Sequence, residues 1–458
     1  MRRFGWRWFV VSSMIVMAVA ANAETRPLYG GVLHLAMRAS PASLDPADVV
    51  QDNTQADSFA RRSLTMLMFD ALVTIDDNDR VLPSLATAWQ THPGGQRWQF
   101  RIRREVKFHD GTPLTAETAA ASLRSANPSW NVVADAESLV IDSSDPNLLA
   151  ELALPRNAIA KRTTDNKPSG TGPFHVVDWQ PGRKLSLAAE ENCWRGRPFI
   201  DAIEIEMGQS FRDQMTALEL GKADLVEVAP EQTHRISPEG RRLATSAPVE
   251  LLALIFSHDV ASPDERLLRE ALALSVERGS IRSVLLQGAG QPTASILPNW
   301  MTGYGFVFPA DADLARARQE REQVPSRTTW ILGYDGRDPL ARLLAERIAL
   351  NAKDAGLSLQ PMPAANAELR LVRIPLAAPD PWIALAGLAT FAGLPAEKTH
   401  AGVEDLYASE VAMLATRRVI PLFHLPVSYA SASSLKNWAL RPDGSWAVAD
   451  AWLRSPRQ

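Results

Sequence analysis

The sequence predicts an α/β protein with two large lobes or about three globular units. Its 458 residues allow that many units at roughly 150 residues per domain. Residues 328–374 read as strand, helix and strand, the pattern of a βαβ unit. A hydrophobic content of 46% and a charged content of 22% are typical of a globular protein that buries large cores.

The first 23 residues read as a secretory signal peptide. Three arginines within the first seven residues precede an apolar run at 8–21, which ends in Ala21-Asn22-Ala23, the form of a cleavage site. This run is shorter than the ~20 residues that a membrane helix needs. We therefore expect cleavage after Ala23 and a mature protein in the periplasm.

The net charge argues against nucleic-acid binding, and the cysteine count excludes an internal disulfide. A formal net charge of −4 offers no basic excess for nucleic acid, so we expect no nucleic-acid partner. Cys193 is the single cysteine, so the chain has no internal disulfide. We expect Cys193 to be a small buried apolar residue.

The stretch from Trp98 to Ala116 is the most informative part of the chain. Apolar and polar residues alternate from Trp98 to Ile102, which predicts a strand with one buried face. His109-Asp110-Gly111-Thr112-Pro113 reads as a tight turn, and Thr115 stands where a helix N-cap would be, three residues before Thr118. No second histidine or carboxylate lies at ligand spacing, so the turn is expected to have a structural role.

Apolar spacing and turn residues predict the remaining elements in order. We expect strands at 30–37, 203–205, 251–256, 328–333, 369–374 and 419–429, and helices at 55–72, 212–221, 262–288, 339–355 and 404–416. The highly charged stretch 316–323 reads as a solvated helix or a linker. We also expect a hairpin that pairs residues 139–141 with 148–154 across the turn at 145–147.

The decapeptide FHDGTPLTAE at 108–117 resembles the signature of the solute-binding proteins of family 5. These are the peptide, dipeptide and nickel-chelate receptors of ABC importers. Further segments resemble family motifs between residue 31 and about residue 452: Leu44-Asp45-Pro46, 69–73 with Asp70 in place of the family's Glu, 81–89, 169–174, 192–198, 269–278 and 419–424.

This resemblance implies a two-lobed periplasmic binding protein fold of type II, similar to cluster C, with the second lobe inserted into the first. The implied boundaries are lobe I at 24–255 and 420–458, and lobe II at 256–419. Such a receptor closes on its ligand by a hinge motion and then docks on a permease in the inner membrane. We expect a monomer with a small-molecule or peptide ligand, and no cofactor or metal.

The resemblance also bears on the ligand. In peptide-binding members, an Asp in a "W.xDYxDP" segment holds the α-amino group of the peptide, and alignment places Ala377 at that position. A buried ammonium without a carboxylate is costly, so ordinary oligopeptides are disfavoured unless Asp380 replaces the missing Asp. Nickel-chelate members bind their metal complex through arginine, aromatic residues and a histidine, for which Trp382 and His424 are candidates by position.

Seven residues are therefore candidates for ligand contact, and each has a structural role as its alternative interpretation. They are two polar residues after the first turn, two aromatic residues in a Gly/Pro loop where aromatic side chains often line ligands, and three residues placed by the resemblance. The list is Asp52, Asn53, Trp300, Tyr304, Asp380, Trp382 and His424.

Two other functions compete with the importer receptor. A receptor that has lost import and passes a ligand signal to a sensor would suit the missing Asp and a segment at 124–167 that is short for the family. A periplasmic hydrolase would need a nucleophile or metal site, and the sequence contains no GxSxG, no HExxH and no Cys-His pair. We place the importer receptor first, the sensor second and the hydrolase third, and expect no enzyme activity.

Overall fold

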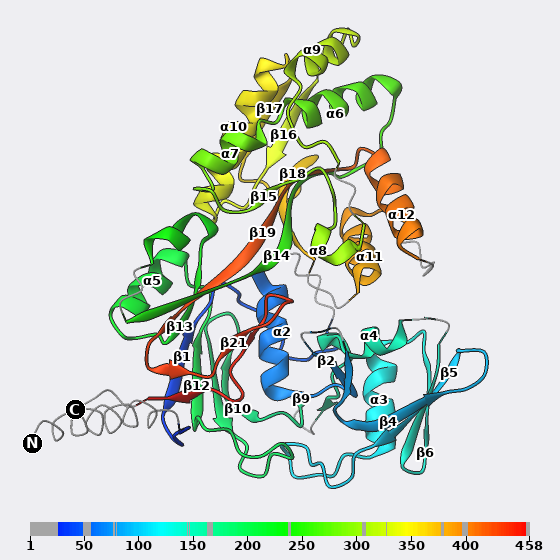
Figure 1. The fold of residues 1–458 in the computed structure, drawn as a ribbon, viewed down its shortest axis with the longest axis vertical. Helices are drawn as coiled ribbons and strands as arrows, with labels where there is room; N and C mark the ends of the chain where they lie inside the picture. Colours follow the sequence, from blue (N-terminus) through cyan, green and yellow to red (C-terminus); the bar gives the residue numbers. More distant parts are fainter. Residues whose placement is uncertain are drawn as a thin grey trace, which may run out of the picture.

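The chain folds into two α/β lobes that share one large sheet (Figure 1). The computed structural model describes residues 26–48, 56–76, 78, 80–143, 145, 147–162, 168–236, 240–304, 308–326, 328–376, 380–395 and 402–454. The predicted two-lobed α/β fold class is confirmed. No helix within these ranges is both long enough and apolar enough to span a membrane.

The large sheet has 11 strands and runs through both lobes. Its order is β10-β11-β12-β1-β13-β19-β14-β18-β16-β17, and β15 pairs with β19 beside this path. The strands are β1 (Val32–Ala36), β10 (Phe174–Gln180), β11 (Lys184–Ala189), β12 (Ala202–Glu206), β13 (Leu225–Val228), β14 (Arg241–Phe256), β15 (Gln291–Pro292), β16 (Thr329–Gly333), β17 (Ser358–Met362), β18 (Leu369–Pro375) and β19 (Val419–Ala432).

Two long antiparallel strands carry the chain between the lobes. In Figure 1, β14 and β19 run side by side from the lower lobe, which contains β1, to the upper lobe, which contains β16. The chain therefore leaves lobe I along β14 and returns along β19. The expected lobe boundaries, at 255/256 and at 419/420, fall at the upper ends of these strands and stay a prediction.

Helices cover both faces of the sheet in lobe II. Leu252, Leu254 and Phe256 of β14 pack with one helical layer, while the alternate residues 251, 253 and 255 pack with the other. A strand that is covered on both faces reads as a continuous apolar run, which explains LLALIF at 251–256. The first layer contains α6 (Pro263–Ser275), α7 (Arg278–Val284), α9 (Leu314–Glu322) and α10 (Pro339–Asp354), and the second contains α8 (Asn299–Thr302), α11 (Pro381–Ala392) and α12 (Val403–Ala415).

Lobe I adds a smaller sheet to its part of the large one. This four-stranded sheet has the order β4-β5-β7-β6 and packs against α3 and α4. The elements of lobe I outside the large sheet are α2 (Ala56–Met68), α3 (Ala116–Ala126), α4 (Leu148–Leu152), α5 (Phe211–Glu219), β2 (Val73–Ile75), β3 (Val81–Pro83), β4 (Ala86–Thr91), β5 (Arg97–Ile102), β6 (Asn131–Asp135), β7 (Ser138–Asp142), β8 (Lys161–Arg162), β9 (Pro168–Ser169), β20 (Leu435–Lys436), β21 (Ala439–Leu440), β22 (Trp446–Ala447), β23 (Trp452–Leu453), and the 3-10 turns 155–157 and 230–235.

The decapeptide motif forms the turn and helix start that were predicted. Gly111 has φ +81°, and Asp110 accepts hydrogen bonds from the backbone and the side chain of Thr112. Thr115 caps α3, with a reciprocal hydrogen bond between Thr115 and Thr118. His109 donates from Nε2 to the carbonyl of Gly172 at 3.0 Å, which joins this motif to the glycine-rich turn at 169–174.

Several of the sequence motifs meet at the buried carboxylate of Asp70, whose side chain is 1% exposed. Asp70 accepts hydrogen bonds from Thr171 Oγ1 at 2.9 Å, Trp194 Nε1 at 2.9 Å and Arg195 Nη2 at 2.6 Å. The donors come from the motifs at 169–174 and 192–198, and the acceptor from the motif at 69–73. A structural role therefore accounts for these motifs without catalysis.

Two secondary-structure predictions are wrong, and several elements, among them β17 and α11, were not predicted. The hairpin at 139–154 does not form, because β7 pairs with β5 and β6, while residues 148–152 form α4 with Leu148 and Leu152 buried one turn apart. The helix expected at 262–288 is two helices, since Val276 is extended. Strand β17 was not predicted because only Leu359 of its five residues packs against the core and Pro361 argues against a strand.

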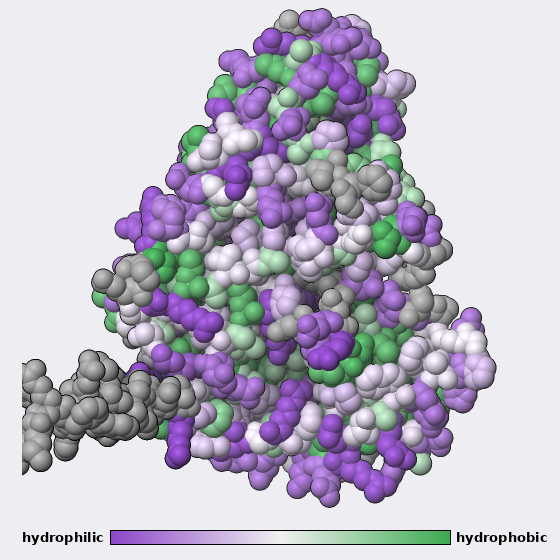
Figure 2. Space-filling view, viewed as in Figure 1, coloured by the Kyte–Doolittle hydropathy of each residue, from purple (hydrophilic) through white to green (hydrophobic). Residues whose placement is uncertain are grey.

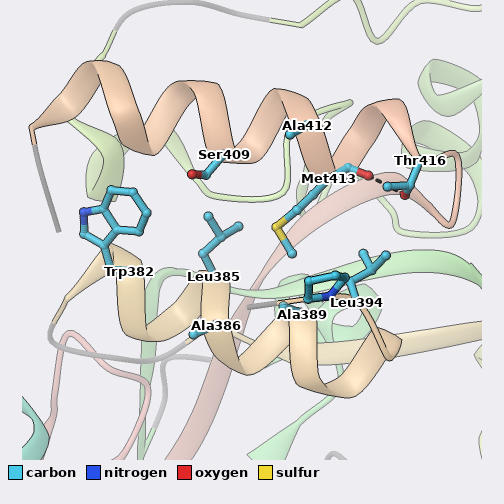
Figure 3. A pocket seen from close by; sticks show the side chains of 10 residues that line it. Trp382, Leu385, Ala386, Ala389, Leu394, Ser409, Ala412, Met413 and Thr416 are labelled. Carbon is cyan, nitrogen blue, oxygen red and sulfur yellow. Dashed lines mark hydrogen bonds between the residues drawn. The ribbon is translucent and has the colours of Figure 1, made fainter. Parts of the chain in front are cut away.

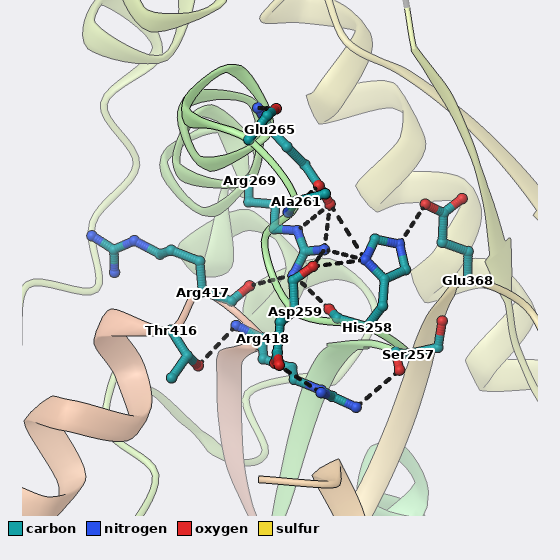
Figure 4. Close-up of polar contacts among 11 residues, drawn as sticks. Ser257, His258, Asp259, Ala261, Glu265, Arg269, Glu368, Thr416, Arg417 and Arg418 are labelled. Atoms are coloured by element: carbon teal, nitrogen blue, oxygen red, sulfur yellow. Dashed lines mark hydrogen bonds and ion pairs between the residues drawn. The ribbon is translucent and has the colours of Figure 1, made fainter.

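A buried arginine connects the segment that follows β14 with the segment that precedes β19 in lobe II. Arg269 of α6 is 0% exposed, pairs with Glu265 and donates to the carbonyls of His258 and Arg417 (Figure 4). His258 in turn contacts Glu368 at 3.0 Å. The carbonyl of Asp259 and then Glu368 raise the pKa of His258. This cluster joins the segment after β14 to the segments before β18 and β19.

Candidate functional site

A polar pocket of about 480 Å³ lies where lobe II meets lobe I; we call it the junction pocket. Its walls combine Arg38, which follows β1 in lobe I, with the crossing strand β14 and the loops after β16 and β17. The lining residues are Arg38, Glu250, Leu252, 333–338, Ala341, Leu344, 363–366, 370–373 and Phe391. Strands β16 and β17 are parallel, and ligands of α/β sheets bind beyond the carboxyl ends of such strands.

The pairing of β18 leaves room for this pocket. β18 meets β16 only through Leu369 and Arg370, whereas β14 follows β18 along its whole length. Among the described residues, no strand pairs with the β16 side of β18 beyond Arg370, which leaves an open strand edge there. Gly333 allows the backbone of Ala364 to pack closely against β16 at the pocket, because a Cβ at position 333 would lie 2.2 Å from the carbonyl oxygen of Ala364.

Most charged groups of the pocket neutralise each other. Arg373 lies 3.9 Å from Glu250 and 3.7 Å from Asp338, and Arg337 contacts both carboxylate oxygens of Asp335 at 3.1 Å. Burial alone would lower the pKa of Arg373, but its carboxylate neighbours raise it. Burial also raises the pKa of Glu250. These pairs give the pocket a charged wall, in which the pair of Arg337 and Asp335 is hydrogen-bonded.

Arg370 differs from the other arginines that line the pocket. Among the residues that the structure describes, it has no carboxylate within ion-pair distance. Its guanidinium lies 5.7 Å from the centre of the Phe391 ring. Burial, together with the charge of Arg418, lowers the pKa of Arg370.

Two of the predicted site residues belong to a buried polar network under the loop before α8. Tyr304 donates from its hydroxyl to Glu410, which also accepts from the backbone of Ile296 and Leu297. His424 donates from Nε2 to the carbonyl of Ile296 at 3.0 Å. Burial raises the pKa of Tyr304 and of Glu410, and lowers the pKa of His424 to about 4. This network joins α12 and β19 to the loop.

Trp300 and Asp380 lie where the lobes approach each other. Trp300 is 47% exposed and donates from its indole nitrogen to the carbonyl of Pro248 at 2.8 Å. Asp380 caps α11 by accepting from the backbone of Trp382 at 2.8 Å. Its other carboxylate oxygen accepts from Asn147 Nδ2 at 3.0 Å, a direct hydrogen bond between lobe II and lobe I. Asp380 is therefore engaged as a cap and as an interlobe contact.

Trp382 lines a second cavity, of about 160 Å³, between α11 and α12. Figure 3 shows its indole ring, together with Leu385 and Met413, in the space between the two helices. The lining is almost wholly apolar, so this cavity lacks the groups that a polar solute needs.

None of the five described candidates lines the junction pocket, and as ligand contacts they stay predictions. Asp52, Asn53 and the clamp position Ala377 lie outside the described residues. Sequence reasoning missed the charged residues of the pocket, although the carboxyl ends of the βαβ strands at 328–374 were a usable signal. Within the described ranges, no three His, Cys, Asp or Glu side chains are grouped to hold a metal ion.

The fold and the junction pocket together define a class: two-lobed receptors that hold a solute between α/β lobes. The chain belongs to the bacterial extracellular solute-binding proteins of family 5, whose middle-region model matches residues 80–377. The resemblance of the sequence motifs is thereby confirmed.

Individual relatives are distant. The nickel-binding protein NikA of Staphylococcus aureus is 26% identical over 244 residues, which cover 49% of this chain and 49% of that protein. The probable D,D-dipeptide-binding periplasmic protein DdpA of Escherichia coli is 23% identical over 380 residues, covering 74% and 71%. The chain thus spans about half of the first relative in sequence and somewhat more than two thirds of the second.

Solved structures show the same fold over nearly the whole chain. NikA of S. aureus in complex with Ni(L-His)2 has a TM-score of 0.80 at 17% identity, covering 92% of this chain and 100% of that one. The oligopeptide-binding protein AppA of Bacillus subtilis with a nonapeptide has a TM-score of 0.81 at 16% identity, covering 94% and 100%. At such identities the likeness establishes the fold alone.

Proposed function

We propose that this chain is the receptor of an ABC importer, which captures a small polar solute in the junction pocket and delivers it to a permease in the inner membrane. The observation that carries the proposal is a charged pocket whose walls come from both lobes. Family members are binding proteins rather than enzymes, and we assign no catalytic step to the pocket. The mature receptor starts after Ala23 and acts in the periplasm as a monomer.

Lobe closure couples ligand binding to delivery. A ligand shifts the equilibrium toward the closed form only through contacts that the closed form alone offers. Arg38 from lobe I and residues 370–373 of β18 from lobe II both line the pocket, so a ligand there can contact both lobes. The hydrogen bond from Asn147 to Asp380 adds a contact that closes the lobes without ligand.

Pocket size supports a small solute. A volume of about 480 Å³ lies within the ~300–1,000 Å³ of ordinary small-molecule sites. The open edge of β18 adds backbone donors and acceptors, so a ligand with an amide or carboxylate can bind there as an added strand does.

Figure 2 supports the monomer. Hydrophilic side chains cover the upper end of this face, over α9 and α10, and apolar side chains come to the surface in small separate groups. Permanent partners bind to larger continuous apolar surfaces.

The test measures whether small solutes stabilise residues 24–458 through this pocket. A solute library is screened by thermal unfolding, because a ligand that binds only the folded form must raise the unfolding temperature. Ala341→Phe, which fills the pocket from α10, is expected to abolish the shift. Leu343→Phe, on the exposed face of the same helix, is the matched control and should keep it. A shift that survives Ala341→Phe, or a library without any shift, would contradict the proposal.

A further inference from the structure

The charges that line the junction pocket do not balance internally. Four arginines and three carboxylates line it, and the carboxylates are those of Glu250, Asp335 and Asp338. Each of these carboxylates lies within ion-pair distance of Arg373 or Arg337. The lining residues alone therefore carry one more positive than negative charge.

The other two arginines that line the pocket, Arg38 and Arg370, differ in their charge partners. Arg38 pairs with Glu227 at 3.5 Å and lies over the Phe211 ring at 4.1 Å. Arg370 has only the face of Phe391 and, within the described part of the chain, no ion-pair partner. A half-buried guanidinium without a counter-charge is unfavourable, and an anion at that position removes the cost.

Two of the carboxylates that line the pocket also accept backbone hydrogen bonds, besides pairing with arginine. Asp338 also caps α10 by accepting from the backbone of Leu340 at 2.9 Å, and Asp335 accepts from the backbone of Arg337 at 3.0 Å. Glu231 has a buried oxygen without a partner, but it does not line the pocket, and burial raises the pKa of its carboxyl toward the neutral form. A ligand ammonium would have to displace an arginine from its carboxylate.

We propose that the solute is an anion whose carboxylate, or a similar oxyanion, is held by Arg370, and that it needs no ammonium group. This inference rests on the proposed function, since it names the ligand class of the same pocket. An anion-binding arginine beside Phe391 would also accept an apolar or planar group next to the carboxylate. The missing clamp carboxylate at Ala377 agrees with this ligand class.

Three probes of similar size show whether binding needs the carboxylate, the ammonium group or both. Acetyl-alanyl-alanine carries a carboxylate only, alanyl-alanine amide carries an ammonium only, and alanyl-alanine carries both. At millimolar concentration, we expect acetyl-alanyl-alanine to raise the unfolding temperature most and alanyl-alanine amide not to raise it. Succinate and glutarate extend the series to anions without a peptide group.

Variants of Arg370 test the contact itself. Arg370→Gln should weaken binding of the best carboxylate roughly 10- to 100-fold, the range for a lost charge-assisted hydrogen bond, and Arg370→Lys should retain part of it. Arg342→Gln, which removes an exposed arginine of α10 paired with Glu346, is the matched control and should leave binding unchanged. The ligand-free Arg370→Gln protein should unfold at or above the wild-type temperature, because it loses an unpaired charge.

Contrary outcomes separate this inference from the proposed function. Stabilisation by alanyl-alanine amide but by none of the carboxylates, or carboxylate binding that is unchanged in Arg370→Gln, overturns the anion inference. If neutral or cationic solutes then bind and are blocked by Ala341→Phe, the receptor proposal still stands. A protein that no solute of any charge stabilises overturns both.

Discussion

Asp70 should be one of the most sensitive positions for stability in lobe I. Its buried carboxylate accepts from Thr171, Trp194 and Arg195. Removing one partner of a buried charge pair costs about 3–5 kcal/mol. Arg195 is 41% exposed and can regain water, so Asp70→Ala should lie at the lower end of that range, about 3 kcal/mol. Asp70→Asn keeps an acceptor oxygen and should cost about 2 kcal/mol.

Thermal and urea unfolding of residues 24–458 measure this effect. For a unit of lobe size, a loss of about 3 kcal/mol lowers the unfolding temperature by roughly 6–12 °C. Asp178→Asn, at an exposed carboxylate that accepts a hydrogen bond from Gln180, is the control and should stay within about 0.5 kcal/mol of the wild type. Equal stability of Asp70→Ala and Asp178→Asn would refute the argument that the hydrogen bonds of the sequence motifs to Asp70 stabilise lobe I.

Three further outcomes are expected. Gly172→Ala places a Cβ 2.5 Å from the backbone of α2 and should lower the unfolding free energy by about 1–3 kcal/mol, whereas Gly279→Ala, with no atom within 4 Å, should not; urea unfolding compares them. The pKa of His424 is lowered from 6.5 to about 4, so its contribution of about 3 kcal/mol is present above pH 6.5 and is lost as pH falls toward 4. The pH dependence of unfolding should therefore flatten in His424→Gln, and an unchanged slope would contradict this. Asn147→Ala removes the hydrogen bond to Asp380 and should increase the radius of gyration of the ligand-free protein in small-angle scattering; no change would show that the contact does not hold the lobes.

Local signals predicted many of the longer elements and failed where they were weak or ambiguous. The cap at Thr115 and the apolar run at 251–256 each have one physical explanation, and both predictions are confirmed. Residues 148–152, with three leucines in five positions, fit a buried strand or a short helix equally well, and only the tertiary contacts of α4 decide. Strand β17 gives a weak signal, because Leu359 is its one residue packed against the core and Pro361 disfavours a strand.

The junction pocket could not be predicted in the same way, because its parts are distant in sequence. Arg38, Glu250, Arg337 and Arg370 come together only when β1 of lobe I approaches the carboxyl ends of the lobe II strands. No local pattern marks these four residues as neighbours. That Arg370 has no ion-pair partner among the residues that the structure describes is likewise a property of the folded arrangement, since aspartates and glutamates occur on both sides of it in the sequence.

The division between motif and pocket residues has a physical basis. The residues that identify the family at 69–73, 108–117, 169–174 and 192–198 form one hydrogen-bonded network in lobe I, in which we expect Asp70 and Gly172 to tolerate little change. Residues that line the pocket stand at strand ends and loops, where a substitution alters charge and shape without disturbing a core. A receptor can therefore keep its lobe I scaffold while its ligand changes. For this reason the motifs identify the family, and the charge balance around Arg370 carries the information about the ligand.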